Sequence, residues 1–363
     1  MAVATLPLRI TTSSLRTSGR WRKVGAMKPA FIALLVLCLC LPMAGAEKKK
    51  TAVEEDGYKG RVKSVKHSRF IISEKFGKPF RERGIVDHTS KYDRKGNRLE
   101  RVTYNADGKP GKKLTFKYNG KGDRLEGVWV YASWKLTQTN TFKYDEKGNM
   151  LEEVHYNVDR ELTDKTTFKY DKKGNMLEEV HYNISRNPDA KATSKYNEKG
   201  DLLETVVYDA NGKITIRNTY KYDEKGNMLE WIRHDASGKI TNKKISTYDE
   251  KGNVLEGVEY NASTKFIYKF TSTYDEKGNK LEGAIYTVHG QLHRKTNFKY
   301  DEKGNVLEAV EVDASGKLID KSTSKYDERG NKVTRTRYKP GAGLGEKRSV
   351  PALEFTWDFN YWD

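Results

Sequence analysis

The seven histidines are the first candidates for metal binding or acid–base chemistry. His155 and His181 occupy the same position in adjacent copies of an internal repeat. On a sheet of hairpins they would lie two strand spacings apart, about 10 Å, whereas two imidazoles that share a zinc ion each lie about 2 Å from it. His289 and His293 are four residues apart, but the residues around them predict a turn and a strand instead of a helix. We therefore expect no metal site and assign these histidines to the polar faces of a sheet.

Acidic turns recur through the chain and raise calcium binding as a second possibility. Calcium takes about six to eight oxygens, and known loops place acidic residues at alternating positions, but a lysine stands in the middle of nearly every turn here. Glutamates such as Glu152 and Glu178 recur too uniformly for an acid–base pair, so we expect them to face the recurring lysines. The sequence has no nucleophile elbow, Walker loop or zinc-protease motif. It predicts no catalytic residue, no cofactor and no metal, and therefore no enzyme.

Two tryptophans stand at variable positions of the repeat and are the candidates for ligand binding. An exposed indole ring can stack on a sugar ring, and Trp231 has Arg233 and His234 close by in sequence. Trp129 occupies a comparable variable position. The alternative is ordinary cross-strand packing of these rings.

A repeat of 26 residues must position all of these side chains. Ten copies follow one another over residues 92–338 without insertion or deletion, and each has Gly four residues after its first Tyr. The first residues of the copies are Tyr92, Tyr118, Tyr144, Tyr170, Tyr196, Tyr222, Tyr248, Tyr274, Tyr300 and Tyr326.

Each copy predicts two strands and two tight turns. Asp171 and Gly174 are typical of a type I turn that glycine closes at positive φ, which is a common hairpin connection. A second turn follows about a dozen residues later, as at residues 209–212. The flanking Thr, Phe, Tyr and Val residues favour strands. We therefore predict an all-β fold, an antiparallel hairpin-repeat meander of about 20 strands.

Two shapes are compatible with this meander. Neither face of the predicted strands is cleanly apolar, so we expect one layer, either extended or coiled into a solenoid. Sheet twist disfavours a flat ribbon of this length. The sequence does not distinguish an open ribbon from a closed spiral, and it does not give the oligomeric state.

The two ends of the array depart from the repeat, as terminal units that cover exposed edges do. Residues 58–91 predict an N-terminal capping hairpin. Residues 339–363 predict a loop and a C-terminal capping strand, in which aromatic residues alternate with polar ones between Phe355 and Tyr361. Residues 47–57 predict a solvated linker.

Residues 1–46 have the pattern of a secretory signal. They are basic without an acidic residue, contain an apolar run over residues 30–41 and end in Ala-Gly-Ala. The apolar run is shorter than the roughly 20 residues that span a bilayer. We predict cleavage between Ala46 and Glu47, with an uncleaved anchor or an organelle transit peptide as alternatives.

The start and the redox chemistry of the chain follow from the same segment. Met27 followed by a lysine would be a more ordinary start than Met1. Both cysteines, Cys38 and Cys40, lie within the predicted signal. We therefore expect a mature chain without disulfides.

The segment Tyr-Asp-x-x-Gly followed by Leu, as at residues 222–229, resembles the YD repeat of rearrangement-hotspot (RHS) proteins and teneurins. The YD/RHS-type resemblance covers residues 58–338. It implies hairpins wound into a spiral shell that encloses a toxin or carries cell-surface binding. The sequence departs from that pattern in its longer period and in the Asn or Asp that follows the glycine. It also shows no RHS core segment or toxin domain after residue 338.

The leading functional hypothesis is a secreted or periplasmic, non-catalytic repeat protein that offers an interaction or structural surface at the cell envelope. The net charge of +18 favours an anionic polysaccharide or an envelope protein as partner through general electrostatics. Secretion and the interleaving of lysines with glutamates argue against nucleic acid. Under this hypothesis the chain does not span a membrane once its signal is cleaved.

Two alternatives remain. An outer-membrane β-barrel would explain the signal, the hairpins and the aromatic last strand, but transmembrane strands have about 9–11 residues and an apolar outward face. The strands predicted here carry Lys, Glu and Thr densely. An RHS-like component of a toxin-delivery system is the other alternative. The sequence names neither the ligand nor the host.

Overall fold

The computed structural model describes residues 50–363 except for residues 76–77, 133–135, 184, 186, 263–265 and 341–348. The predicted signal and its Ala46–Glu47 junction lie outside the described residues. No helix in the described part of the chain is long and apolar enough to cross a membrane.

The described residues form one short helix and antiparallel strands. In chain order these are α1 (Ala52–Glu55), β1 (Val62–Lys75), β2 (Lys78–Arg81), β3 (Ile85–Tyr92), β4 (Arg98–Tyr104), β5 (Pro110–Tyr118), β6 (Arg124–Tyr131), β7 (Leu136–Tyr144), β8 (Met150–Tyr156), β9 (Leu162–Tyr170), β10 (Met176–Tyr182), β11 (Pro188–Tyr196), β12 (Leu202–Asp209), β13 (Ile214–Tyr222), β14 (Met228–Asp235), β15 (Ile240–Tyr248), β16 (Val254–Asn261), β17 (Phe266–Tyr274), β18 (Lys280–Tyr286), β19 (Leu292–Tyr300), β20 (Val306–Asp313), β21 (Leu318–Tyr326), β22 (Lys332–Pro340) and β23 (Ser349–Tyr361).

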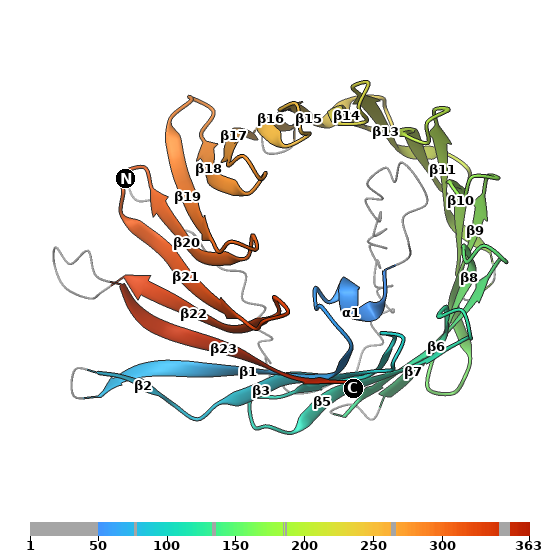
Figure 1. Ribbon diagram of the computed structural model, residues 1–363. Coiled ribbons are helices and arrows are strands. Elements are labelled where there is room, and N and C mark those ends of the chain that lie inside the picture. Colours follow the sequence, from blue (N-terminus) through green and yellow to red (C-terminus); the bar gives the residue numbers. More distant parts are fainter. Residues whose placement is uncertain are drawn as a thin grey trace, which may run out of the picture. The chain divides into compact units, whose positions relative to one another are not determined.

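The meander closes on itself. Each strand from β3 to β22 pairs with the next, and β1 pairs with both β3 and β23. Of the 23 strands in the sheet, only β2 stands outside the ring, because it extends β1 as a hairpin. The fold is therefore a 22-strand antiparallel β-barrel (Figure 1). The prediction of an extended or coiled solenoid was wrong, because the two end segments pair with each other instead of each covering an edge.

The turn chemistry of each repeat sets the hairpins. Asp171 accepts the backbone N–H groups of Lys173 and Asn175 on Oδ1, both at 2.8 Å. Gly174 has a φ of 92°, in the left-handed region that glycine adopts without a steric penalty. The strand that follows contains a β-bulge, because the register passes from Met176 directly to Glu178 and leaves Leu177 without a partner.

The register explains how a chain of hairpins becomes a barrel. Glu178 lies opposite Lys169 on one side and Thr193 on the other. Lys169 lies one position before Tyr170, whereas Thr193 lies three positions before Tyr196. The pairing register between strands therefore shifts by two residues in every repeat. Such a shift tilts the strands by about 35° and gives a ring of 22 strands a diameter of about 40 Å.

Two side chains tie each repeat to its neighbour and account for the strict period. The repeat tyrosine donates its hydroxyl to a backbone carbonyl of the preceding repeat, as Tyr196 does to Met176 at 3.0 Å. The turn lysine donates Nζ to a carbonyl in the next turn, as Lys147 does to Lys172 at 2.8 Å. The latter bond recurs from Lys95, Lys121, Lys147, Lys173, Lys199, Lys225, Lys251 and Lys303. An insertion within a strand would move the residues after it out of register with these bonds.

The wall is one layer thick and has solvent on both faces. Side chains that point to either face remain partly exposed, such as that of Glu153 at 27% and that of Glu178 at 17%. We call inner the face that carries Val65, Ser90 and Arg101, which lie opposite one another, because α1 packs against it and lies inside the ring (Figure 1). The outer face carries Glu178 and Val180 and the residues in register with them.

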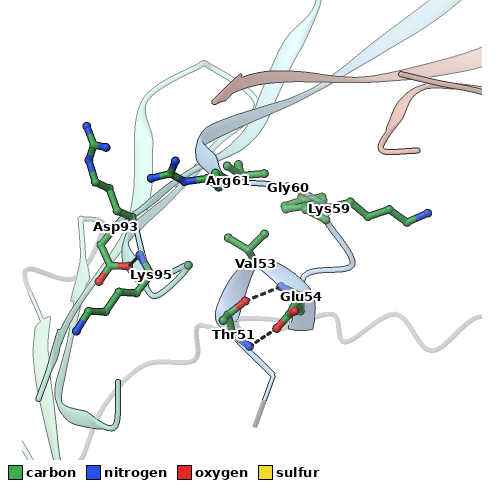
Figure 2. Close-up of a pocket in the computed structure, with 12 residues that line it drawn as sticks. Thr51, Val53, Glu54, Lys59, Gly60, Arg61, Asp93 and Lys95 are labelled. Carbon is green, nitrogen blue, oxygen red and sulfur yellow. Dashed lines mark hydrogen bonds between the residues drawn. The ribbon is translucent and has the colours of Figure 1, made fainter. Parts of the chain in front are cut away.

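The two end segments meet at a seam formed by α1, β1 and β23. Its core consists of Ala52, Val53, Val62, Val65 and Tyr92, with Tyr58, Trp357, Phe359 and Tyr361 packed around them. Part of the segment predicted as a solvated linker is therefore ordered here, and Val53 is 3% exposed. Thr51 and Glu54 form a capping box at the start of α1 (Figure 2).

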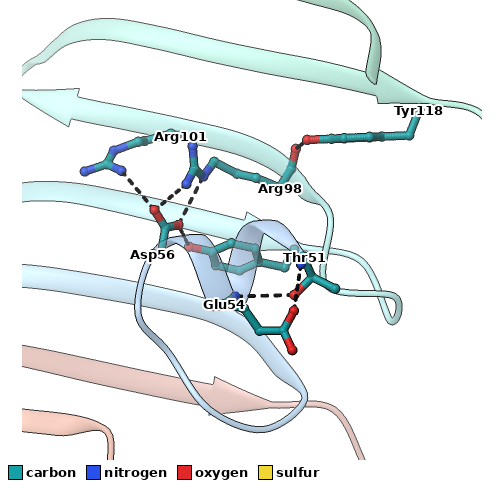
Figure 3. A network of polar contacts seen from close by, with 7 residues as sticks. Thr51, Glu54, Asp56, Arg98, Arg101 and Tyr118 are labelled. Atoms are coloured by element: carbon teal, nitrogen blue, oxygen red, sulfur yellow. Dashed lines mark hydrogen bonds and ion pairs between the residues drawn. The ribbon is translucent and has the colours of Figure 1, made fainter. Parts of the chain in front are cut away.

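Asp56 binds the seam to the first repeat. Its carboxylate accepts the hydroxyl of Tyr92 and two guanidinium N–H groups of Arg98, and Arg101 lies 3.8 Å away (Figure 3). Burial, and then the charge of Asp56, raise the pKa of Tyr58. At the other end of the array, Asn331 exchanges two hydrogen bonds with the backbone of Lys59. The segment between α1 and β1 thus joins the first repeat to the last.

Closure also overturns two expectations about location. A closed ring has no free strand edge and satisfies its backbone hydrogen bonds internally, which is what a bilayer requires of a β-structure. Barrels of 16 to about 22 strands that enclose a lumen are known from outer membranes. The expectation of a freely secreted or periplasmic chain, and of one that does not span a membrane, is corrected accordingly.

Candidate ligand-binding site

The predicted ligand-binding residues lie at two separate places on the wall. Trp129 is on β6, whereas Trp231, Arg233 and His234 are on β14. Trp231 and Arg233 lie opposite Tyr220 and Asn218, which belong to the inner face. His234 points to the outer face, where it lies opposite Arg217. The structure therefore separates His234 from the other two and brings neither group to Trp129.

The inner wall is hollowed beside Trp129. A cavity of about 160 Å³ lies between β6, β7, β8 and β9. Its lining combines aromatic, amide, imidazole and carboxylate groups, from Trp129, Tyr131, Gln138, Asn140, His155 and Asp164.

Gly127 leaves the space that the indole ring of Trp129 occupies. Gly127 and Trp129 lie two residues apart on the same face, and a Cβ on Gly127 would stand 2.6 Å from the ring. The repeats that follow carry Glu153 and Glu179 at the position of Gly127. Phe116 supports the ring in an edge-to-face contact with centroids 6.0 Å apart. The indole is thus held against the wall and borders the cavity.

A chain of polar contacts forms the opposite side of the cavity. Asn140 donates Nδ2 to Glu153 at 3.2 Å, and Glu153 lies 2.6 Å from Nε2 of His155. The other ring nitrogen of His155 lies 3.1 Å from Asp164, and His181 approaches the same carboxylate at 3.8 Å. Such a site can stack a ring on Trp129 and exchange hydrogen bonds with its polar substituents.

His155 and His181 both approach the carboxylate of Asp164. No group of His, Cys, Asp and Glu that could hold a metal ion is found among the described residues. Sequence reasoning singled out Trp129 but missed Gln138, Asn140 and Asp164, because their place depends on register. The available signal was Gly127, where neighbouring repeats have a larger residue.

Comparisons with known proteins give no family. No protein-family model matches the chain, and no curated protein matches it. Among solved structures, the crystal structure of TcdB2-TccC3-TEV has 13% identity and a TM-score of 0.31 over 77% of this chain. The match covers 19% of that chain, so this chain spans about a fifth of its length.

A second solved structure is a porin-like protein from Bacteroides uniformis ATCC 8492. It has 10% identity and a TM-score of 0.28, and the match covers 82% of this chain and 98% of that one. Because identities and TM-scores are this low, neither likeness assigns the chain to a family.

Proposed function

We propose that the chain is an outer-membrane β-barrel that encloses an aqueous passage. The observation that carries this proposal is the pairing of β1 with both β3 and β23, which leaves the ring without an open edge. A ring about 40 Å wide is too wide for its own side chains to fill. The polar inner wall suits a water-filled lumen.

Two rows of side chains near the rims support insertion. The leucine that the bulge leaves unpaired is 38–43% exposed in all nine copies that have it: Leu99, Leu125, Leu151, Leu177, Leu203, Leu229, Leu255, Leu281 and Leu307. Near the other rim the outer face carries Tyr104, Tyr156, Tyr182, Tyr208, Tyr260, Tyr286 and Tyr338. Aromatic girdles of this kind mark the interfaces of membrane barrels. A strand of nine residues at the inferred tilt rises roughly 24 Å, close to the apolar thickness such barrels cover.

The outer face also carries charges, and they are paired. Glu178 lies between Lys169 at 2.6 Å and Lys191 at 2.5 Å. Five further glutamates, Glu100, Glu152, Glu204, Glu230 and Glu308, are flanked in the same way by two basic residues, so the expectation that glutamates face lysines is confirmed. Charges placed near lipid are costly unless they pair with one another. Pairing therefore lowers the cost of placing these charges on the outer face.

Fractionation of cells that express the full chain tests the proposal. We expect the protein to remain in the membrane pellet after alkaline carbonate and to need detergent for extraction. The purified protein should then give stepwise conductance in planar bilayers. Release by carbonate together with an absence of conductance would overturn the proposal.

Two residues that are adjacent in the sequence but lie on opposite faces of the wall provide a matched pair of variants, which tests whether ions pass through the lumen. Glu153 lies on the inner face and Glu152 on the outer face. Glu153→Gln should shift ion selectivity towards anions, because it removes a negative charge from the lumen, whereas Glu152→Gln should leave ion selectivity unchanged. Equal effects of the two variants would contradict a conducting lumen inside this ring.

A further inference from the structure

The cavity beside Trp129 is large enough for one six-membered ring. Its volume of about 160 Å³ is close to that of a cavity that holds a benzene ring, about 150 Å³. It lies on the inner wall, because Trp129 is opposite Leu114, and Leu114 is opposite Arg101 of the inner face. A ligand in this cavity therefore lies in the lumen of the proposed barrel.

The indole ring of Trp129 forms the apolar side of the cavity. The ring leans over Gly127, and Phe116 meets it edge to face. The side chain is half-buried and lines the cavity, so part of the ring is open to a ligand. The negative face of an aromatic ring attracts weakly positive hydrogens. The C–H face of a sugar ring presents such hydrogens.

Two amides on the other side of the cavity have hydrogen-bonding capacity that the fold leaves unused. Gln138 is exposed and lies opposite Trp129 in the register. Within the described ranges, no group hydrogen-bonds the side-chain amide of Gln138. Asn140 donates Nδ2 to Glu153 at 3.2 Å, and no described residue donates to its Oδ1. Together these amides offer donors and acceptors to a ligand.

The charges at the cavity favour a neutral ligand. Asp164 brings a carboxylate to the lining, which repels an anion. This carboxylate lies 3.1 Å from His155 and 3.8 Å from His181, and Glu153 lies 2.6 Å from His155. Both carboxylates therefore already face an imidazole that can carry a positive charge. Asp164 keeps lone pairs for a hydroxyl group, because a carboxylate accepts about four hydrogen bonds.

We propose that this cavity binds one ring of a neutral saccharide. The C–H face of the sugar stacks on Trp129, and its hydroxyl groups, which both donate and accept, bond to Gln138, Asn140 and Asp164. The placement of this site in a lumen rests on the proposed function, whereas sugar binding itself does not. In a conducting barrel the site holds sugars on their path through the lumen.

Calorimetric titration of the full chain with maltose, cellobiose and lactose tests the site. The protein is folded in a detergent that has no sugar headgroup, and each sugar is added up to about 100 mM. Trp129→Leu keeps an apolar side chain but removes the aromatic face. Gln138→Ala removes an exposed amide that has no partner in the described fold, so this variant is expected to fold normally.

The chain offers a matched control for each variant. Trp231→Leu changes a second tryptophan of the inner face, on β14. Asn242→Ala changes an amide of the inner face that stands at the position of Gln138 in another repeat, six residues before the repeat tyrosine. Thermal unfolding of all four variants checks that the barrel stays folded.

We expect saturable binding of at least one of the three sugars. Trp129→Leu should weaken it about tenfold or more and Gln138→Ala about threefold or more, whereas each control should change it by less than about twofold. Absence of saturable binding for all three sugars, or equal weakening by the test and control variants, would overturn the site. Saturation by tetramethylammonium in place of any sugar would also overturn it, because the cavity would then bind a cation on the indole ring.

Binding in detergent and conductance in bilayers separate this inference from the proposed function. Sugar binding without conductance would support the site and contradict the passage. Conductance without sugar binding would support the passage and contradict the site.

Discussion

The repeat wall, from β3 to β22, and the seam hold the same barrel together by different means. The wall repeats the same kinds of short-range bond: those of a turn Asp or Asn, of a lysine to the next turn, of a tyrosine to the preceding repeat and of a glutamate between two cations. The seam uses one apolar core and the polar contacts of Asp56 and Asn331, and these join residues that are far apart in the sequence. Loss of one bond in the wall leaves many equivalent bonds in place. The contacts of the seam are not repeated in this way, so the loss of one of them should have a larger effect on the barrel.

Deletion of β23 should have the largest effect, because it removes the partner of both β1 and β22. We expect a chain that ends at residue 340 to lose the closed ring, to form no conducting pore and to show a larger radius of gyration by small-angle scattering in detergent. The control replaces the β2 hairpin, residues 73–82, with a short turn. This control should keep the ring and its conductance, and a closed ring in both proteins would contradict the role of the seam.

Asp56→Asn should destabilise the barrel by about 3 kcal/mol, because it leaves Arg98 without its counter-charge at a site that is about 15% exposed. The midpoint of thermal unfolding in detergent measures the change. Asp107→Asn is the control on the wall, where the carboxylate is 55% exposed and lies 3.7 Å from Lys109. That change should cost less than about 0.5 kcal/mol. Similar losses from both variants would mean that the seam is no more sensitive than the wall.

The contrast also explains which parts of the structure the sequence predicts. Turns, hairpins and the pairing of glutamates with lysines depend on residues within one repeat or its neighbour, and these expectations are confirmed. Closure depends on whether β1 and β23 match after ten repeats have each added a small register shift. The total register shift over ten repeats cannot be deduced from the residues of any single repeat. The alternating aromatic residues of β23 predict a cover for an exposed edge, whereas in the structure β23 pairs with both β1 and β22.

The candidate site shows the same limit. Trp129 stands out from the sequence because its position varies between repeats. Asn140 and Asp164 belong to two later strands, and only the observed register brings them to one cavity with the indole. A pocket of about 440 Å³ between α1 and the turn that joins β3 to β4 lies still further from prediction, because residues of an expected linker and of the first turn of the array line it.

Glu178→Gln tests the contribution of one glutamate and its two lysine partners to the stability of the wall. The glutamate side chain is 17% exposed, and its two lysines are 74% and 43% exposed, so we expect a loss of about 0.5–1 kcal/mol in thermal unfolding. The loss should shrink at high salt, which screens exposed pairs. Asp56→Asn should keep most of its effect at the same salt concentration. A loss at Glu178 that does not depend on salt would contradict the ion-pair interpretation.

The smallest expected effect is the pH dependence of one turn. The side-chain amide of Asn227, and then backbone N–H groups, hold the pKa of Asp223 below its ordinary value of 3.8. A carboxyl group whose pKa is lower in the folded state stabilises the fold above its unfolded pKa, and this contribution disappears as the pH falls through the folded pKa. Unfolding midpoints between about pH 7 and pH 3 should therefore fall on the acid side. Asn227→Ala should flatten that fall slightly, because the main cause of the pKa shift is removed. Asn211→Ala is the matched control, since Asn211 bonds to its turn aspartate through its backbone N–H, and it should leave the pH profile unchanged. A steeper acid fall in Asn227→Ala would reverse the sign and contradict this account of the turns.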